Sequence, residues 1–343
     1  MLLYFLSITL VAFLLTGLIR YYALKRKVLD IPNQRSSHTI PTPRGGGLAI
    51  VLTMMFAVLS LTLTQQIDQR ILALCMASIL VAGIGFCDDH KPVPAKWRFL
   101  THLVTAFLIV RLLGGFPLLL VPSPMDGFLK RFFIDLSWIG YPLAIVWLVW
   151  FLNLFNFMDG TDGIAASESL FMSLALAGYS YYLDQTLFNL CICLAAATLG
   201  FLVWNWPKAG IFMGDVGSGF LGLLLGVLIL LAAQQAAVML FCGLILFGIF
   251  FVDASYTLLV RMLSRQKWYD AHCSHTYQRA AKQYGHLPVL LACWLINLLW
   301  LLPLSYWVFL HPSHGLVGLF IAYAPLLFMA FRFKAGQRDS VNV

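Results

Sequence analysis

Charge is scarce in this chain of 343 residues: Asp, Glu, Lys and Arg make up 10% of it, whereas hydrophobic residues make up 61%. Soluble domains carry roughly 25% charged residues, so this sequence cannot cover a water-facing surface. Internal repeats, low-complexity segments and a soluble domain are not visible either. We therefore predict an integral membrane protein with a single polytopic domain over residues 1–343.

Two further features are missing. The apolar runs are continuous over about 15–25 residues, without the roughly ten-residue alternating segments of barrel strands, so the spanning elements should be helices. The seven cysteines form no obvious oxidised framework. Five fall in apolar runs, and Cys87 and Cys273 fall on the expected inner side, as suits a reducing cytoplasm.

The apolar runs predict an all-α bundle of about eleven transmembrane helices. The third, fourth and sixth runs are short, and neighbouring residues could extend them. The expected spans are Leu2–Ile19, Gly46–Leu63, Ile71–Phe86, Phe99–Leu113, Ile139–Phe155, Ser169–Leu183, Leu187–Trp204, Val216–Ala233, Ala236–Val260, Pro288–Leu310 and Gly315–Phe331.

The positions of basic residues predict the orientation. The first span reads as an anchor rather than a cleavable signal, because its positive charge follows it, at Arg20 and Lys25–Lys27. With the N-terminus outside and eleven crossings, 18 of the 22 Lys and Arg residues fall on the inner side and 4 on the outer side. By the positive-inside rule, the N-terminus is then periplasmic and the C-terminus cytoplasmic. The net charge of +8 also favours anionic lipid headgroups or phosphorylated substrates.

Four polar clusters interrupt the apolar chain, and all four fall on the expected inner side. They are the pair Asp88 and Asp89, the run from Asn153 to Asp162, Asp215 with its flanking glycines, and the run from His272 to Arg279. Polar groups gathered at one membrane interface are typical of an active site. We therefore expect a metal-dependent site at the cytoplasmic interface.

Two of these clusters are acidic and suit a cation. Asp88 and Asp89 could hold a cation or accept a proton, with Lys96 and Arg98 as phosphate-binding candidates, or they could simply end a solvated helix. In the second cluster, Asn153, Asn156, Asp159 and Asp162 recur every three residues. Their hard oxygen ligands suit Mg²⁺, with Mn²⁺ as an alternative. The structural alternative is that the two Asp-Gly pairs form turns and helix caps.

The other two clusters also have structural alternatives. Asp215 begins an apolar run and could be a helix cap or a ligand, while Gly222 and Gly226 have the spacing that packs spans together. His272, His275 and Arg279 could bind a diphosphate, or could belong to a solvated basic loop. A zinc site at His272, Cys273 and His275 lacks a fourth ligand. Asp253, inside the ninth span, is expected to be a hydrogen-bonding strut.

Taken together, these segments resemble those of the polyprenyl-phosphate N-acetylhexosamine-1-phosphate transferases. The matching segments follow the family order through most of the chain. They are PNQRSSHTIPTPRGGG (Pro32–Gly47), GFCDDHKPVPAKWR (Gly85–Arg98), NLFNFMDGTDGIAA (Asn153–Ala166), FMGDVGSGFLG (Phe212–Gly222) and the histidines of the last large inner loop.

The resemblance implies a reaction and a set of roles. Undecaprenyl phosphate would attack the β-phosphorus of a UDP-N-acetylhexosamine and release UMP, with Mg²⁺ at the diphosphate. Asp215 would be the leading metal ligand with Asn156 beside it, and Asp88 and Asp89 would orient or deprotonate the lipid phosphate. Asp159 and Asp162 would lie near the nucleotide. Lys96, Asn153, His272, His275 and Arg279 would contact the substrates.

The resemblance also suggests a branch of the family and a location. The loop AHCSHTYQRAAKQYGH lacks the consecutive histidines of the peptidoglycan translocase that makes lipid I, and is most similar to the O-antigen-initiating branch. The resemblance implies an enzyme of a bacterial inner membrane that contacts membrane lipids and has no nucleic-acid partner. A dimer is expected by family analogy. Which N-acetylhexosamine it uses stays open. The alternatives are an ion-coupled transporter, a lipid I-type translocase or an inactive scaffold.

Overall fold

The computed structural model describes residues 2–32, 40–123, 125–129, 132–267 and 272–338. The fold is all-α, as predicted. Parts of the expected Pro32–Gly47 segment, and the basic residues Arg35, Lys130 and Arg131, lie outside the described residues. The helices of the first half are α1 (Leu2–Arg26), α2 (Leu48–Leu63), α3 (Gln69–His90), α4 (Ala95–Leu113), α5 (Met125–Leu129), α6 (Gly140–Met158) and α7 (Ile164–Leu183).

The second half continues the bundle with α8 (Gln185–Asn205), α9 (Asp215–Gln235), α10 (Met239–Leu246), α11 (Gly248–Leu263), α12 (Thr276–Tyr284), α13 (His286–Ile296), α14 (Leu302–Leu310) and α15 (Gly315–Arg332). Short turns of helix are η1 (Ser137–Ile139), η2 (Asn297–Leu301) and η3 (Pro312–His314). Two antiparallel two-residue pairs stand outside the bundle: β1 (Leu29–Asp30) with β2 (Thr42–Pro43), and β3 (Leu119–Leu120) with β4 (Phe133–Ile134).

Each of the eleven expected spans coincides with a helix or with a run of joined helices. The three short runs are indeed extended, because α3, α4 and α7 have 22, 19 and 20 residues. Within the described residues, seven helices are long and apolar enough to cross a membrane, or eight if one bent pair is a single span. The number of eleven crossings and the orientation of the termini remain predictions.

The ninth expected span, Ala236–Val260, is not one continuous helix. It is broken into α10 and α11, which meet at an angle of 72°. Phe247 lies at the break, is fully buried, and stacks on Phe151 of α6 with ring centroids 4.7 Å apart. The apolar run continues across the break in the sequence, so hydropathy gave no sign of the bend, which is stabilised by packing.

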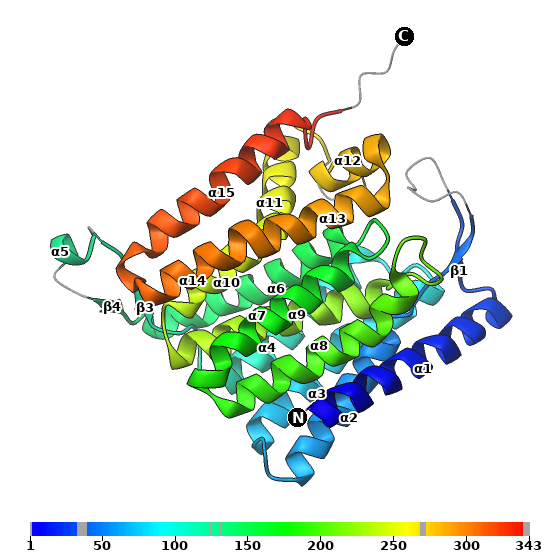
Figure 1. Ribbon diagram of the computed structural model, residues 1–343, viewed down its shortest axis with the longest axis horizontal. Helices are drawn as coiled ribbons and strands as arrows, with labels where there is room; N and C mark the ends of the chain where they lie inside the picture. Colours follow the sequence, from blue (N-terminus) through cyan, green and yellow to red (C-terminus); the bar gives the residue numbers. More distant parts are fainter. Residues whose placement is uncertain (1, 33–39, 124, 130–131, 268–271, 339–343) are drawn as a thin grey trace.

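Helix α9 lies at the centre of the bundle (Figure 1), and 94% of its most apolar stretch is buried. Its glycines allow α6 to approach closely, as the spacing of Gly222 and Gly226 predicted. A Cβ on Gly222 would lie 2.6 Å from the Cβ of Phe155, and one on Gly226 would lie 3.2 Å from the Cβ of Phe151. This close packing holds the N-terminus of α9 in a defined place.

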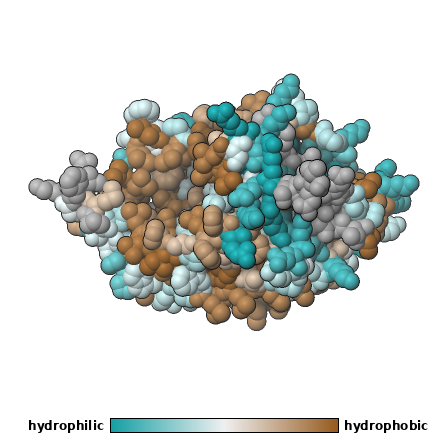
Figure 2. Space-filling view, turned by 90° about the horizontal axis from the view of Figure 1, so that it is seen from above, coloured by the Kyte–Doolittle hydropathy of each residue, from teal (hydrophilic) through white to brown (hydrophobic). Residues whose placement is uncertain are grey.

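The connections of the bundle collect at two ends (Figure 1). The end of α1, the β1 segment, α12 and the end of α15 lie toward one end, and the β3–β4 pair lies toward the other. Figure 2 shows a band of hydrophilic side chains on one part of its face, with apolar surface over much of the rest. The candidate site is built from connections at the end that carries α12.

Candidate functional site

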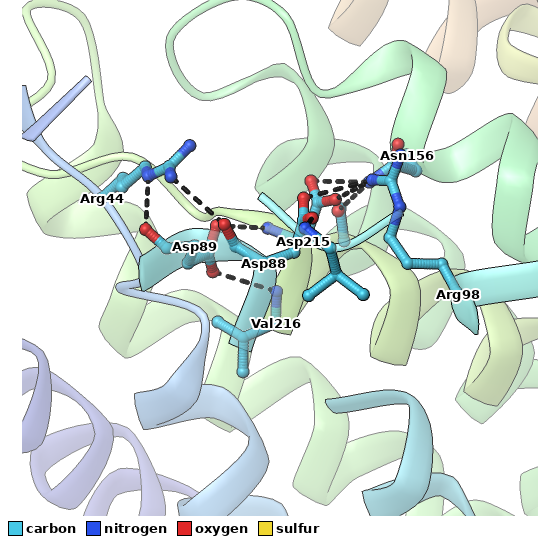
Figure 3. Close-up of polar contacts among 9 residues, drawn as sticks. Arg44, Asp88, Asp89, Arg98, Asn156, Asp215 and Val216 are labelled. Atoms are coloured by element: carbon cyan, nitrogen blue, oxygen red, sulfur yellow. Dashed lines mark hydrogen bonds and ion pairs between the residues drawn. The ribbon is translucent and has the colours of Figure 1, made fainter. Parts of the chain in front are cut away.

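The N-terminus of α9 is capped by a carboxylate from another helix. Asp89, near the end of α3, accepts the backbone N–H of Asp215 at 3.0 Å and that of Val216 at 3.2 Å, one on each carboxyl oxygen (Figure 3). These are two of the N–H groups that a helix start leaves unpaired. Gly214 precedes them with φ 77°, and a Cβ there would lie 2.5 Å from Asp89 Oδ2. The glycine therefore makes room for the cap.

A second segment braces the same turn. The backbone N–H of Phe212 donates to the carbonyl of Pro43 at 2.8 Å, and that of Gly47 donates to the carbonyl of Met213 at 2.9 Å. A side chain on Gly47 would overlap the backbone of Gly217. The start of α2 and the start of α9 are thus in backbone contact, which explains the glycine run in the sequence.

Arg44 ties this segment to the end of α3. Its guanidinium donates to the carbonyl oxygens of Asp89 at 2.8 Å and Asp88 at 3.3 Å, where a helix end leaves carbonyls unpaired (Figure 3). The Asp88 side chain points elsewhere: its Oδ1 accepts the backbone N–H of Val93 at 2.6 Å. The two adjacent carboxylates therefore have different tasks, one caps α9 and the other faces the site.

Arg98 joins two carboxylates from different helices. One guanidinium nitrogen lies 3.1 Å from Asp88 Oδ2 and 2.9 Å from Asp215 Oδ2 (Figure 3). Asn156, near the end of α6, donates to Asp215 Oδ1 at 3.1 Å and to the hydroxyl of Ser218 at 2.8 Å. The side chains of Asp88, Asp215 and Arg98 are 17%, 32% and 35% exposed, so a ligand can reach them. Helices α3, α4, α6 and α9 each contribute one group.

Asp159 lies just past the end of α6, close to this cluster. Removal from water, together with the nearby carboxyl groups of Asp215 and Asp89, raises the pKa of Asp159 to about 8. Three carboxyl groups in one neighbourhood repel each other when ionised. The cluster therefore favours a cation, which would lower the electrostatic cost of ionising all three.

Three predicted site residues have their recorded contacts outside this cluster. Asp162 accepts the backbone N–H of Ala209 at 3.2 Å and lies 3.2 Å from the Nδ1 of His286. The amide of Asn153 donates to the carbonyl of Val149 in its own helix at 2.6 Å. Lys96 is exposed, with its Nζ 5.6 Å from the ring centre of Trp97.

The last large inner loop is held by Asp253, which acts as the expected strut but binds the loop rather than another span. Its two carboxyl oxygens accept the backbone N–H groups of Thr276 at 2.9 Å and Tyr277 at 3.0 Å, at the start of α12. The Tyr277 hydroxyl donates to the carbonyl of Phe157 at 3.0 Å. Helix α12 is thereby attached to the end of α6, two residues before Asp159.

The loop histidines sit beside this attachment. His275 is buried, with its Nδ1 3.4 Å from Asp253 Oδ1, and its ring stacks on His272 at 4.9 Å. Burial, helped by His275 and Arg261, lowers the pKa of His272 to about 3, so it is neutral near pH 7 and cannot supply charge to a diphosphate. Arg279 donates to the carbonyl of Gln337 at 2.6 Å.

Several residues that build the site were not among the predicted site residues. Arg98 was weighed with Lys96 as a phosphate-binding candidate, but only its position on α4 shows that it bridges Asp88 and Asp215. Arg44 belongs to the PTPRGGG segment, and its basic charge beside glycines was the available signal. Neither Ser218 nor His286 stood out in the sequence.

The donor set fits a hard cation bound partly by substrate. Carboxylate, amide and hydroxyl oxygens suit Mg²⁺ or Mn²⁺. Among the described residues, no group of three or more His, Cys, Asp and Glu side chains could hold a metal by itself, and this holds for His272, Cys273 and His275 as well. Mg²⁺ commonly uses one or two carboxylates and completes its shell with waters and substrate phosphates.

Comparisons with known proteins indicate the family of this chain. The sequence model of glycosyl transferase family 4 matches residues 71–233, which include Asp88, Arg98, Asn156 and Asp215. A probable undecaprenyl-phosphate N-acetylglucosaminyl 1-phosphate transferase of Bacillus subtilis is 29% identical over 93% of this chain and 87% of its own. A decaprenyl-phosphate N-acetylglucosaminephosphotransferase of Mycolicibacterium smegmatis is 32% identical over 64% of this chain, which spans 57% of that protein.

A third relative comes from another branch. A phospho-N-acetylmuramoyl-pentapeptide-transferase of Wolbachia is 31% identical over 65% of this chain and 68% of its own. All three relatives are named as transferases of a phosphorylated sugar, and two of the names include a polyprenyl phosphate. With the family match and the cluster at the start of α9, the chain belongs to glycosyl transferase family 4, among the polyprenyl-phosphate hexosamine-1-phosphate transferases.

Proposed function

We propose that this protein transfers N-acetylhexosamine 1-phosphate from a UDP-sugar to undecaprenyl phosphate, giving undecaprenyl-diphospho-sugar and UMP. The observation that carries the proposal is the pair of carboxylates, Asp88 and Asp215, bridged by Arg98 at one end of the bundle. Two relatives are named for a polyprenyl phosphate and for N-acetylglucosamine phosphate, which supports the lipid and the sugar of this proposal. Family membership gives the transporter alternative no support.

The cluster suits phosphoryl transfer, which depends on positioning and charge neutralisation more than on covalent chemistry by the protein. One substrate is a membrane lipid and the other is a soluble nucleotide, so the site must lie where both can reach it. We place it at the cytoplasmic interface. Arg98 is half-exposed and uses one nitrogen for both carboxylates, so its remaining N–H groups can donate to a phosphate.

We assign Mg²⁺, with Mn²⁺ as an alternative, to the oxygens of Asp215 and Asp88, with Asn156 beside them. Asn156 orients Asp215 by donating to its Oδ1, and Ser218 holds Asn156 in turn. When bound, the cation would neutralise the diphosphate and increase the electrophilicity of its phosphorus. The residues' own contribution is to hold two carboxylates from different helices on one side of the substrate.

A general base is dispensable in this scheme. The second pKa of a phosphoryl group is about 6, so the lipid phosphate is mostly ionised at neutral pH. Asp89 has both carboxyl oxygens on the backbone of α9, and Asp162 accepts from Ala209 beside His286. We therefore give Asp89 and Asp162 positioning roles. The carboxyl group of Asp159 interacts electrostatically with Asp215 and Asp89, and Asp159 stays a candidate for nucleotide or metal contact.

We assign substrate-binding roles to the loop residues. His272 and His275, both on the loop that Tyr277 attaches to α6, would contact the nucleotide or sugar, and His272 would do so as a neutral hydrogen-bonding group. Lys96 is exposed close to Arg98 in the chain and can approach a phosphate from outside. The contacts of Asn153 and Arg279 suggest structural support for α6 and α12.

We assign an N-acetylhexosamine substrate and a role at the start of O-antigen or related surface-glycan synthesis in a bacterial inner membrane. The Bacillus N-acetylglucosaminyl relative aligns over 93% of this chain, whereas the pentapeptide transferase aligns over 65%. The absence of consecutive histidines from the loop AHCSHTYQRAAKQYGH also favours an N-acetylhexosamine substrate over the substrate of the pentapeptide transferase. A homodimer in membrane lipids remains part of the proposal.

The test is an assay of membranes and purified protein with undecaprenyl phosphate, Mg²⁺ and a competing set of UDP-N-acetylhexosamines. We expect one sugar to give a lipid-linked product together with UMP, and Asp215→Asn to abolish both. Asp126→Asn, the same chemical change in α5, is the matched control and should keep activity. Absence of lipid product and UMP with every sugar, where a known transferase is active in parallel, would overturn the proposal.

A further inference from the structure

A carboxyl group lies deep in the bundle, away from the candidate site. Glu168 of α7 is 2% exposed, and its one recorded hydrogen bond comes from the amide of Asn297, which donates to Oε2 at 2.7 Å. Asn297 is 3% exposed and begins the π-helical turn η2, which joins α13 to α14. Helices α7 and α13 contact each other, and this pair links α7 to the turn η2 that directly follows α13.

The pair leaves one oxygen on each side chain without a partner. Glu168 Oε1 and Asn297 Oδ1 are both buried and accept no hydrogen bond. Buried polar atoms are nearly always paired, and two unpaired acceptors on contacting side chains call for a donor. Among the described residues, no Lys, Arg or His forms an ion pair with Glu168. An ionised carboxylate in this place would be costly in a membrane.

We propose that Glu168 and Asn297 form a buried proton-binding site, in which Glu168 is a neutral carboxylic acid. A proton on Oε1 gives the acid an O–H group that donates to Asn297 Oδ1, while the amide donates to Oε2. A single proton thus satisfies both unpaired oxygens and removes the buried charge. A hard metal cation fits poorly, because such ions take six or more oxygen ligands and the pair offers two.

The proton would fasten the turn after the C-terminal end of α13 to α7. The other end of α13 begins at His286, whose Nδ1 lies 3.2 Å from Asp162 Oδ2, and α13 follows α12 and its loop histidines in the chain. Loss of the proton would leave a buried carboxylate at this interface and weaken it. The titratable neighbour is Cys293 on α13, whose thiol is within electrostatic reach of Glu168. Helices α6, α8, α9 and α10, which also pack on α7, bring no ion-pairing side chain to it.

The test uses the purified full-length protein and three variants. Glu168→Gln keeps the shape and supplies an N–H in place of the proton, Glu168→Ala removes both groups, and Cys293→Ala is the control for the neighbouring thiol. Infrared difference spectra at neutral pH should show a carboxylic-acid C=O band in the wild type and in Cys293→Ala, which is lost in Glu168→Gln. Melting temperatures should be similar for the wild type and Glu168→Gln, and several degrees lower for Glu168→Ala.

The pH dependence gives a second, independent reading. The melting temperature of the wild type should fall more steeply from about pH 4 upward than that of Glu168→Gln, because the folded wild type keeps a proton that the unfolded chain releases. The proposal is overturned if no carboxylic-acid band disappears in Glu168→Gln, or if Glu168→Gln melts at as low a temperature as Glu168→Ala. A carboxylate band of Glu168 at neutral pH would also overturn it, because sodium or a bridging water would then stabilise an ionised side chain. These readouts do not use transferase activity, so they can fail without the proposed function failing.

Discussion

Adjacent carboxylates with different tasks give the sharpest prediction. Asp89 is 3% exposed and caps two N–H groups of α9, so replacing it with Ala should lower the stability of the protein. Each buried N–H left without a partner costs about 1–3 kcal/mol, so two of them cost about 2–6 kcal/mol. Asp88→Ala removes contacts with Val93 and Arg98 near the surface of the site, where solvent screens the charge. It should therefore cost less stability, about 1 kcal/mol.

The assay measures the two effects separately. Thermal unfolding of the purified variants should show a drop of several degrees for Asp89→Ala and a small drop for Asp88→Ala. UMP release should be lost in Asp88→Ala although the protein stays folded. Asp68→Ala is the control, because Asp68 caps α3 by accepting from Ile71 at 2.8 Å far from the cluster. It should cost about 0.5–2 kcal/mol and leave activity intact. Equal melting temperatures for the Asp88 and Asp89 variants would refute the capping role.

Four further predictions follow from the same contacts. Arg98→Gln should lower kcat about 100-fold with little change in melting temperature, since it removes charge stabilisation at the site; unchanged kcat would count against its role. Tyr277→Phe should destabilise the protein by about 1 kcal/mol and raise KM for the UDP-sugar, because α12 loses its bond to Phe157. Burial raises the pKa of Asp159 to about 8, so the folded protein keeps a proton that the unfolded chain releases near pH 4. The melting temperature of the wild type should therefore fall as pH rises from about 4 to about 8, and that of Asp159→Asn should fall less. Chelation with EDTA should abolish UMP release and Mg²⁺ should restore it, whereas activity that persists after chelation would remove the cation from the scheme.

Much of the fold could be predicted from the sequence, because the bilayer requires long apolar helices and hydropathy reveals them directly. Each expected span agrees with a helix or with joined helices to within about five residues at each end, except that α1 continues past Ile19 to Arg26. The bend at Phe247 could not be predicted in this way, since it depends on aromatic stacking against α6 rather than on local composition. The π-helical turn that begins at Asn297 also lies within a continuous apolar run, so hydropathy did not predict it.

The site could be predicted as a set of polar segments on one side, but not as a set of contacts. Asp88 and Asp89 are neighbours in the chain, and only the approach of α9 decides which of them is the cap. Arg98 was hard to distinguish from Lys96, because the face of α4 that meets Asp215 is set by packing. Charge was also misleading for His272, which burial keeps neutral.

The most direct measurement follows the β-phosphorus of the UDP-sugar. Purified protein would receive undecaprenyl phosphate, Mg²⁺ and UDP-N-acetylhexosamine labelled only at that phosphorus. If Asp88, Arg98 and Asp215 form one centre for phosphoryl transfer, the label enters the lipid product, unlabelled UMP is released, and Asp215→Asn shows neither. Label that remains in soluble UDP while the sugar alone moves to the lipid would contradict this account.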